Sequence, residues 1–406
     1  MKMNKWTLGL AAVGLVSLTP GLRAADTAAA PVPLMTALSA TTISGYVDTS
    51  AVWNPGTGNV CAAPYAFNAG KQDGFNVDMV DIKITKVLDE GQWAAGYTAE
   101  LNVGPNAAVA LGGFAPIRQA YIELRAPLGN GLDLKVGQWD NILGFEGTDS
   151  YANLNWSRSY GYTIEPTEHV GVLAEYVFNP SVDLKVGVAN ELSTFNRNGS
   201  GGGGAAIESK KALVSLLTLT APDSWGSLKG SALYAGLDYG PGNNFNNFTA
   251  GGHVVDKTHL YIGAVVTTPV TGLKFGAAWD SVNNSDLNAF AVEGYASTLA
   301  AYVSYHPTDS KLTINGRAEY IHGSAFDAPF LPNNAAYVFA NGLPQEAKVM
   351  ALTGTVQYDL WANVISRLEV RWDTSADGSP HFGGTAIGTP TKNNELMVAA
   401  NIIYKF

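Results

Sequence analysis

The sequence predicts an all-β protein, a transmembrane antiparallel β-barrel of about sixteen strands with short periplasmic turns and long extracellular loops. Three observations predict it: segments in which apolar and polar side chains alternate, connections that alternate between short and long, and an export-signal pattern at the N-terminus. Alternation at period two is typical of a strand with lipid on one face and water on the other. Charged residues make up only 14% of the chain, against about 25% in an average soluble domain, which favours a lipid environment.

The N-terminal end has the form of a secretory signal peptide, predicted to span residues 1–24. Lys2 and Lys5 precede an apolar stretch, and a cleavage site is expected after Ala24. That stretch is too short for a membrane helix, which needs about 20 apolar residues. Export to the outer membrane of a Gram-negative cell is therefore expected.

The mature chain is predicted to have two parts. Residues 25–42, rich in Ala, Thr and Pro, are expected to form a periplasmic tail, and residues 43–406 a single outer-membrane barrel. Removal of the signal peptide takes away three basic residues and no acid, so the formal net charge falls from −10 to −13. An acidic chain without a basic run argues against a nucleic-acid partner.

The strands follow one another along the chain as two-faced segments. In residues 311–320 (KLTINGRAEY), Leu312 and Ile314 share one face, whereas Asn315 and Arg317 lie on the other. No amphipathic helix gives this pattern. The sixteen expected strands are residues 43–53, 76–87, 93–103, 117–126, 132–139, 169–178, 181–190, 210–220, 227–239, 258–267, 273–281, 297–306, 311–322, 347–358, 361–373 and 395–406.

The connections between these segments alternate strictly in length. Seven are short, namely LDEGQ, PLGNG, NPS, APDSWG, TPVTG, PTDS and DL, and they separate eight longer loops. This parity is that of an outer-membrane barrel with both chain ends on the periplasmic side. Closure is required because an open sheet edge in hydrocarbon would leave backbone groups without hydrogen bonds.

The C-terminal segment NELMVAANIIYKF places Tyr404 and Phe406 on one apolar face and ends on an aromatic residue. That resembles the signature recognised by barrel-assembly machinery, which we expect as a partner, although an ordinary last strand would also fit. Aromatic residues at strand ends are expected to form the interfacial girdles: Trp53, Trp93, Tyr176, Phe178, Tyr239, Tyr305 and Trp372.

Three motifs carry a resemblance to a known family: GYVDTSAVW at 45–53, IRQAYIELRAPLGNGLDLKVGQWD at 117–140 and SRSYGYTIEPTEHVGVLAEY at 157–176. Together they resemble the putative β-barrel porin-2, OmpL-like family. The resemblance extends over nearly the whole mature chain, in its second half mainly through strand rhythm. It implies an outer-membrane porin-like barrel and supplies no catalytic residue.

The third long loop, about residues 140–168, is the expected constriction, because sixteen-stranded general porins fold a loop at this position into the lumen. Charged side chains at a constriction set selectivity in wide barrels. The predicted constriction residues are the acids Asp140, Glu146, Asp149 and Glu165 and the arginines Arg125, Arg317, Arg367 and Arg371, with Glu168 and Arg118 beside them. Alternatively, the arginines pair with Glu319 and Glu369 along the inner wall.

The expected function is passive diffusion of small hydrophilic solutes through a water-filled channel, with no enzymatic step, cofactor or metal. Outer-membrane lipid is an expected partner, and a homotrimer is expected by analogy with sixteen-stranded porins. Three alternatives stay open: a barrel-embedded hydrolase using His322 and Ser324, a plugged structural or adhesive barrel, and a soluble all-β export.

Three further features have local interpretations. The single cysteine, Cys61, is interpreted as a loop thiol, and Gly201–Gly204 as a flexible loop segment. The Tyr-rich segment around Arg158 fits either packing within the loop or stacking on solutes.

Overall fold

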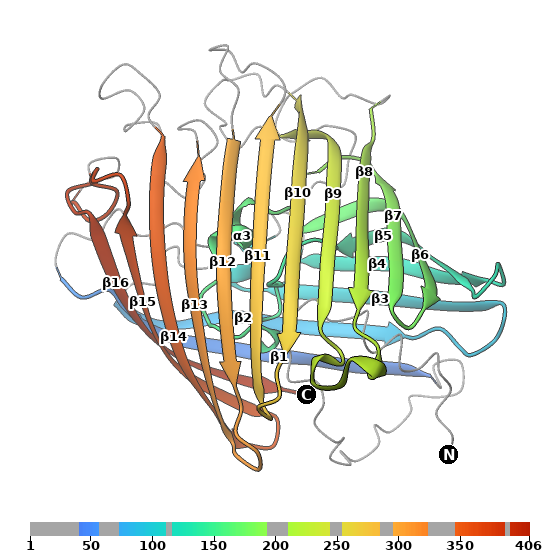
Figure 1. The fold of residues 1–406 in the computed structure, drawn as a ribbon, viewed down its shortest axis with the longest axis horizontal. Coiled ribbons are helices and arrows are strands. Elements are labelled where there is room, and N and C mark those ends of the chain that lie inside the picture. Colours follow the sequence, from blue (N-terminus) through green and yellow to red (C-terminus); the bar gives the residue numbers. More distant parts are fainter. Residues whose placement is uncertain are drawn as a thin grey trace.

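The computed structural model describes residues 40–56, 73–110, 116–192, 210–243, 254–284, 295–323, 346–385 and 390–406. They form a closed antiparallel barrel in which every strand pairs with its sequence neighbours and the last strand pairs with the first (Figure 1). The strands are β1 (Thr41–Trp53), β2 (Gly74–Lys86), β3 (Ala94–Val103), β4 (Ile117–Ala126), β5 (Leu132–Asp140), β6 (Glu168–Asn179), β7 (Val182–Ala189), β8 (Ala212–Thr220), β9 (Ala232–Asn243), β10 (Val254–Thr267), β11 (Leu273–Asn284), β12 (Tyr295–Tyr305), β13 (Leu312–Gly323), β14 (Ala347–Trp361), β15 (Val364–Ser375) and β16 (Asn394–Lys405).

Among the described residues, four short helical segments accompany the strands: α2 (Pro105–Ala110), α3 (Tyr160–Ile164) and the 3₁₀ helices η1 (Ser150–Ala152) and η2 (Asp223–Leu228). In the part of the chain that the structure describes, no helix combines the length and apolar character needed to cross a membrane.

The predicted sixteen-stranded antiparallel barrel is confirmed, with its alternation of short turns and long loops. On β13, Asn315, Arg317 and Glu319 are buried inside, whereas Ile314 is exposed on the outer face. The seam also closes as expected, because the backbone N–H groups of Gly45 and Phe406 each donate to the other residue's carbonyl at 3.0 Å. Closure leaves neither edge of the sheet unpaired in lipid.

The outer face is largely apolar, and three polar side chains on it donate to strand carbonyls. The hydroxyl of Ser215 donates to Leu237 O at 3.1 Å, and that of Ser366 to Tyr358 O at 2.8 Å. The amide of Gln138 donates to Ile117 O at 3.0 Å. Hydrocarbon offers no other partner, so these bonds remove the cost of placing polar groups at the lipid face.

Most strand ends differ from the sequence prediction by one to five residues. β9 begins at Ala232 and not at 227, because residues 223–228 form η2. The Thr267 hydroxyl stabilises η2 by donating to Ser227 O at 3.0 Å. The last short turn is not DL: β14 continues to Trp361, and the chain reverses over the next two residues. Asn363 has a φ of 64° there, a conformation that asparagine tolerates better than most residues.

Several predicted features lie outside the described residues. These are the signal peptide, the periplasmic tail as far as residue 39, Cys61, Gly201–Gly204 and Ser324.

An arginine on the lipid face should destabilise the barrel. Leu352 lies near the middle of β14 and is 52% exposed on the outer face. We expect Leu352→Arg to lower the unfolding free energy by about 2–4 kcal/mol, the cost of a cation near the bilayer midplane. Urea unfolding in lipid vesicles measures this, with Tyr358→Arg near the interface as the control. Equal losses for both variants would contradict the assigned lipid face.

Candidate functional site

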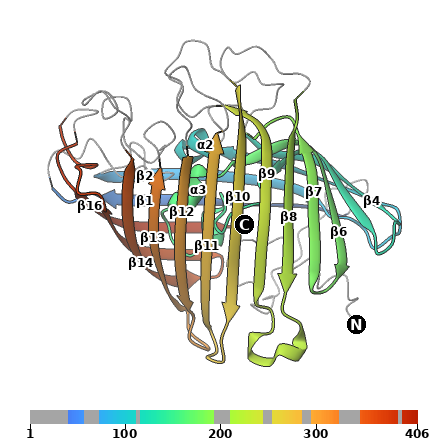
Figure 2. The ribbon, with the colours of Figure 1, turned by 45° about the horizontal axis from the view of Figure 1, so that its top comes forward.

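The loop between β5 and β6, residues 141–167 and here named L3, lies inside the barrel (Figures 1 and 2). Its short helix α3 packs against β11, β12 and β13. At its base, the Asn141 N–H donates to Thr167 O at 2.8 Å, so L3 leaves the wall and returns to it at one point. Trp156, Arg158 and Tyr160 on this loop are almost completely buried.

The first part of L3 is attached to the wall by apolar contacts. Leu143 and Phe145 belong to a buried cluster with Leu216 of β8 and Tyr302 of β12. The rings of Phe145 and Tyr302 stack with centroids 3.9 Å apart. Burial of such side chains contributes about 1.5–3 kcal/mol each. The apolar inner wall of the barrel is therefore covered by the loop.

The middle of L3 is attached by a buried arginine of β13. Arg317 donates to Glu146 of the loop at 2.7 Å and to Glu319 of its own strand at 2.6 Å. It also donates to the Ser157 carbonyl at 2.8 Å. The pairing of a loop acid with a wall arginine and the pairing of that arginine with an acid of the wall thus meet at one guanidinium.

Two arginines of β15 bind the loop backbone. Arg371 donates to Arg158 O at 2.8 Å, and Arg367 donates to Ser150 O and Asn153 O, each at 2.7 Å. Between them, Glu369 accepts the Ser157 N–H at 2.9 Å. These side chains satisfy backbone groups that a buried loop would otherwise leave without partners.

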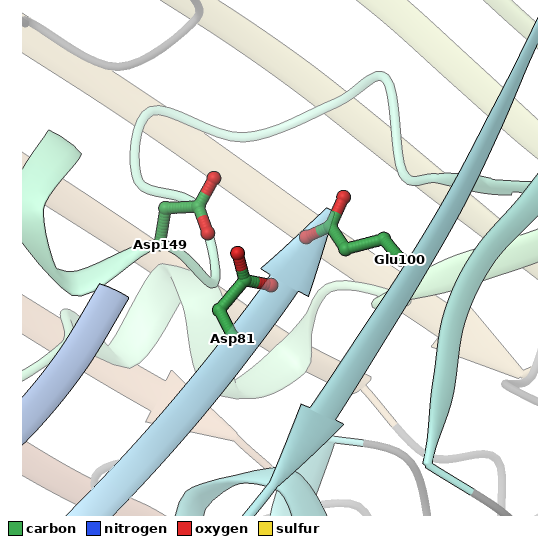
Figure 3. A group of neighbouring side chains, drawn as sticks. All are labelled: Asp81, Glu100 and Asp149. Carbon is green, nitrogen blue, oxygen red and sulfur yellow. The ribbon is translucent and has the colours of Figure 1, made fainter. Parts of the chain in front are cut away.

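The opposite side of L3 reaches an acidic group on β2 and β3. Asp81, Glu100 and Asp149 point toward one another from β2, β3 and the loop (Figure 3). Arg118 of β4 joins them, with Nη1 at 2.6 Å from both Glu100 and Asp149. Its Nη2 is 2.6 Å from Asp140. L3 is therefore linked by ion pairs to β4 as well as to β13.

The same acidic group has the donor set of a cation site. One ligand oxygen from each of the three carboxylates lies within 4.8 Å of the others. Arg118 and Lys83, whose Nζ is 3.1 Å from Glu100, already place positive charge against it. Among the described residues this arrangement fits a salt-bridge network that fixes the loop.

Arg158 holds L3 together from within. Its guanidinium donates to Gly147 O, Thr148 O and Trp156 O at 2.8–2.9 Å. Next to it, the Tyr160 hydroxyl donates to Asp373 at 2.7 Å, and the Arg371 guanidinium lies 4.9 Å from the centroid of that ring. Of the two interpretations of this segment, the contacts fit packing within the loop.

Glu165 lies near the end of the loop, where its carboxyl group is next to that of Asp280 on β11. Burial raises the pKa of the Glu165 carboxyl well above its usual value, and the nearby charges of Asp280 and Glu146 raise it further. Glu146 is paired with Arg317, whereas the neighbouring charges of Glu165 are those of other carboxylates.

Arg125 lies apart from the loop, near the periplasmic end of β4. It forms a two-point ion pair with Asp133 at 2.7 Å for each contact. Other paired charges line the same part of the inner wall, including Glu123 with Lys135 at 3.9 Å and Glu175 with Lys185 at 3.7 Å. We name the six residues of these three pairs the periplasmic wall cluster.

The structure thus brings most of the predicted residues onto L3 and its supports: Asp140, Glu146, Asp149, Glu165, Arg317, Arg367 and Arg371. Sequence reasoning placed Arg118 only near the loop, although it is the centre of the network, and it missed Asp81 and Glu100. The signal for both acids was their position on the polar face of a two-faced strand.

Comparison with solved structures gives similar barrels. The anion-selective porin from Comamonas acidovorans is 12% identical with a TM-score of 0.58, over 90% of this chain and 99% of that one. OmpT of Vibrio cholerae, in vitro folded and in trimer form, is 12% identical with a TM-score of 0.56, over 90% and 99%. The outer membrane channel DcaP of Acinetobacter baumannii is 13% identical with a TM-score of 0.55, over 90% and 97%. At these identities the likeness shows the fold.

No curated protein sequence matches the chain. A family model does: the one described as "Putative beta-barrel porin-2, OmpL-like" matches residues 40–406, which include every strand of the barrel. Family and fold together place the protein in the outer membrane as a porin-like barrel. The chain belongs to the putative beta-barrel porin-2, OmpL-like family.

Proposed function

We propose that this protein is a channel for the passive diffusion of small hydrophilic solutes, without an enzymatic step, and that L3 is its constriction. The observation that carries the proposal is the position of L3, which contacts β4 through Arg118 and β13 through Arg317 inside a closed barrel. Pore width and wall charge determine what passes such a constriction.

The charged supports of L3 are the proposed selectivity residues: Asp140, Glu146, Asp149, Glu165, Arg317, Arg367 and Arg371. Arg125 belongs to the periplasmic wall cluster and is proposed to act on ions at the periplasmic entrance. The partial exposure of its ion pair with Asp133 supports this, because solutes can reach it.

The purified protein should conduct ions. In planar bilayers we expect an ohmic single-channel current, and in liposomes we expect swelling that slows as the sugar probe becomes larger, because a water-filled pore discriminates by size. The heat-unfolded protein is the control. Absence of current and of swelling, from protein that keeps its heat-modifiable migration, would contradict the proposal.

Two alternatives remain testable. A plugged structural barrel is favoured by the many buried bonds between L3 and the wall, and electrical silence would support it. For a hydrolase, His322 lies on β13, where its ring packs against Tyr295 and Tyr320, and Ser324 lies outside the described residues. Ester and phospholipid hydrolysis, with His322→Ala as control, tests this class.

We further propose that residues 1–24 are a signal peptide, that residues 25–42 form a periplasmic tail, and that barrel-assembly machinery recognises Tyr404 and Phe406. The exposure of both rings on the outer face supports recognition before insertion. The trimer form of the Vibrio cholerae protein supports a homotrimer as the proposed assembly.

A further inference from the structure

The end of L3 meets the wall at a buried group of carboxyl and imidazole side chains. The carboxyl groups of Glu165 on the loop and Asp280 on β11 lie next to each other. His259 of β10 has Nε2 at 3.2 Å from Asp280, and His169 of β6 has Nε2 at 3.5 Å from Asp238 of β9. All five side chains are at least nine-tenths buried. We name these five residues the L3 latch.

The contact between Glu165 and Asp280 requires a proton. Two neighbouring buried carboxyl groups repel each other unless one of them carries a proton. The high pKa of Glu165 means that this proton is retained above the pH at which an exposed glutamate loses it. In the docked position of L3, this contact is therefore expected to hold a proton.

The latch also contains buried polar atoms without a hydrogen bond. Both carboxylate oxygens of Asp238 and the Nδ1 atom of His259 have no hydrogen-bond partner among the described residues. Asp238 and His259 are also directly opposed in the register of β9 and β10.

Two glycines of L3 lie against the side chains of this contact. Gly144 has a φ of 103°, and a Cβ at that position would overlap the Glu165 carboxyl group. Gly161, the second residue of α3, faces Asp280, where a Cβ would lie 2.9 Å from Oδ2. Displacement of Glu165 from Asp280 would therefore disturb both the start and the end of the loop.

We propose that the L3 latch is a proton-operated gate: it holds the loop across the lumen when protonated, and deprotonation releases the loop and widens the channel. This rests on the proposed function of the barrel as a channel. The groups that face Glu165 are Glu146 on L3, Asp238 on β9, Tyr261 on β10 and Asp280 on β11. The two latch histidines contact Asp238 and Asp280.

The direction of the effect follows from the raised pKa of Glu165. A carboxyl group whose pKa is higher in the docked state stabilises that state fully at low pH, and the contribution disappears as the pH rises through the docked-state pKa. An ionised Glu165 then repels Asp280 and Asp238. The channel should be narrow at low pH and wide at high pH.

Single-channel recording between pH 5 and pH 9 tests the gate. For the natural chain, the ratio of wide to narrow states should rise about tenfold per pH unit while Glu165 titrates, as expected for one proton. Glu165→Gln keeps a hydrogen-bond donor that cannot ionise, and it should stay narrow at every pH. Asp280→Asn should also stay narrow, because it removes the repelling charge.

Glu123→Gln, in the periplasmic wall cluster, is the matched control and should keep the pH response of the natural chain. Amide hydrogen exchange of residues 141–167, corrected for its intrinsic pH dependence, measures the release of L3 independently of ion conduction. Exchange or conductance that does not change with pH, or a pH response that persists in both latch variants, would overturn the gate. Electrical silence with pH-dependent exchange would instead overturn the channel function and leave the latch standing.

Discussion

A chain in which residues 142–166 are replaced by a two-residue Asn-Gly turn is expected to conduct several times more current than the natural chain. The replacement is geometrically simple, because Asp140 and Glu168 are direct partners in the register of β5 and β6. A two-residue turn of this type fits between antiparallel strands. Without L3 the lumen loses the segment that joins β4 to β13, and the pore width should be set by the wall alone.

The excision should also destabilise the barrel without unfolding it. Leu216 and Tyr302 lose the apolar loop residues that cover them, at about 1.5–3 kcal/mol for each side chain exposed. The ladder of strand hydrogen bonds, including the seam, does not involve L3. Replacement of the exposed residues 223–228 of η2 is the control, and its conductance should equal that of the natural chain. If the excised chain conducts no more than this control, L3 is not the constriction.

The fold could be predicted from the sequence because a strand between lipid and water alternates apolar and polar residues, and this pattern does not depend on tertiary contacts. The segment 311–320 shows it: Arg317 and Glu319 had to lie inside once Ile314 lay outside, and β13 places them so. Strand ends depend on tertiary contacts instead. Nothing local indicates that Thr267, some 40 residues away, holds η2 and so delays the start of β9.

The residues of the candidate site could largely be predicted from the sequence, but which of them pair with one another could not. Alternation identifies the strand residues that face the lumen, and the long third connection identifies the loop. Which acid meets which arginine depends on how L3 folds back across the lumen, and no periodicity encodes that path. Asp149 therefore binds Arg118 and not an arginine of the opposite wall, and Glu165 meets Asp280, a residue that sequence reasoning did not single out.

Replacement of Arg317 by methionine is expected to release the middle of L3. The guanidinium is fully buried and compensates Glu146 and Glu319. Its loss leaves the buried Glu146 without its cation and leaves Glu319 with Arg371 alone, at 3.6 Å. Removal of one partner from a buried ion pair costs about 3–5 kcal/mol. Since each 1.4 kcal/mol is about a factor of ten, the docked state should lose at least about a hundredfold in its equilibrium.

The release can be measured by proteolysis, because Arg158 is the single Lys or Arg between residues 141 and 167. In the docked loop its guanidinium is enclosed by L3 carbonyls, so trypsin should cut the natural chain slowly and the Arg317→Met chain much faster, with a parallel rise in conductance. Arg125→Met is the matched control, since it breaks an equally short pair with Asp133 that does not touch L3. Similar cleavage rates in the two variants would mean that the Arg317 network does not hold the loop. Faster cleavage with unchanged conductance would mean that a loosened L3 does not widen the pore.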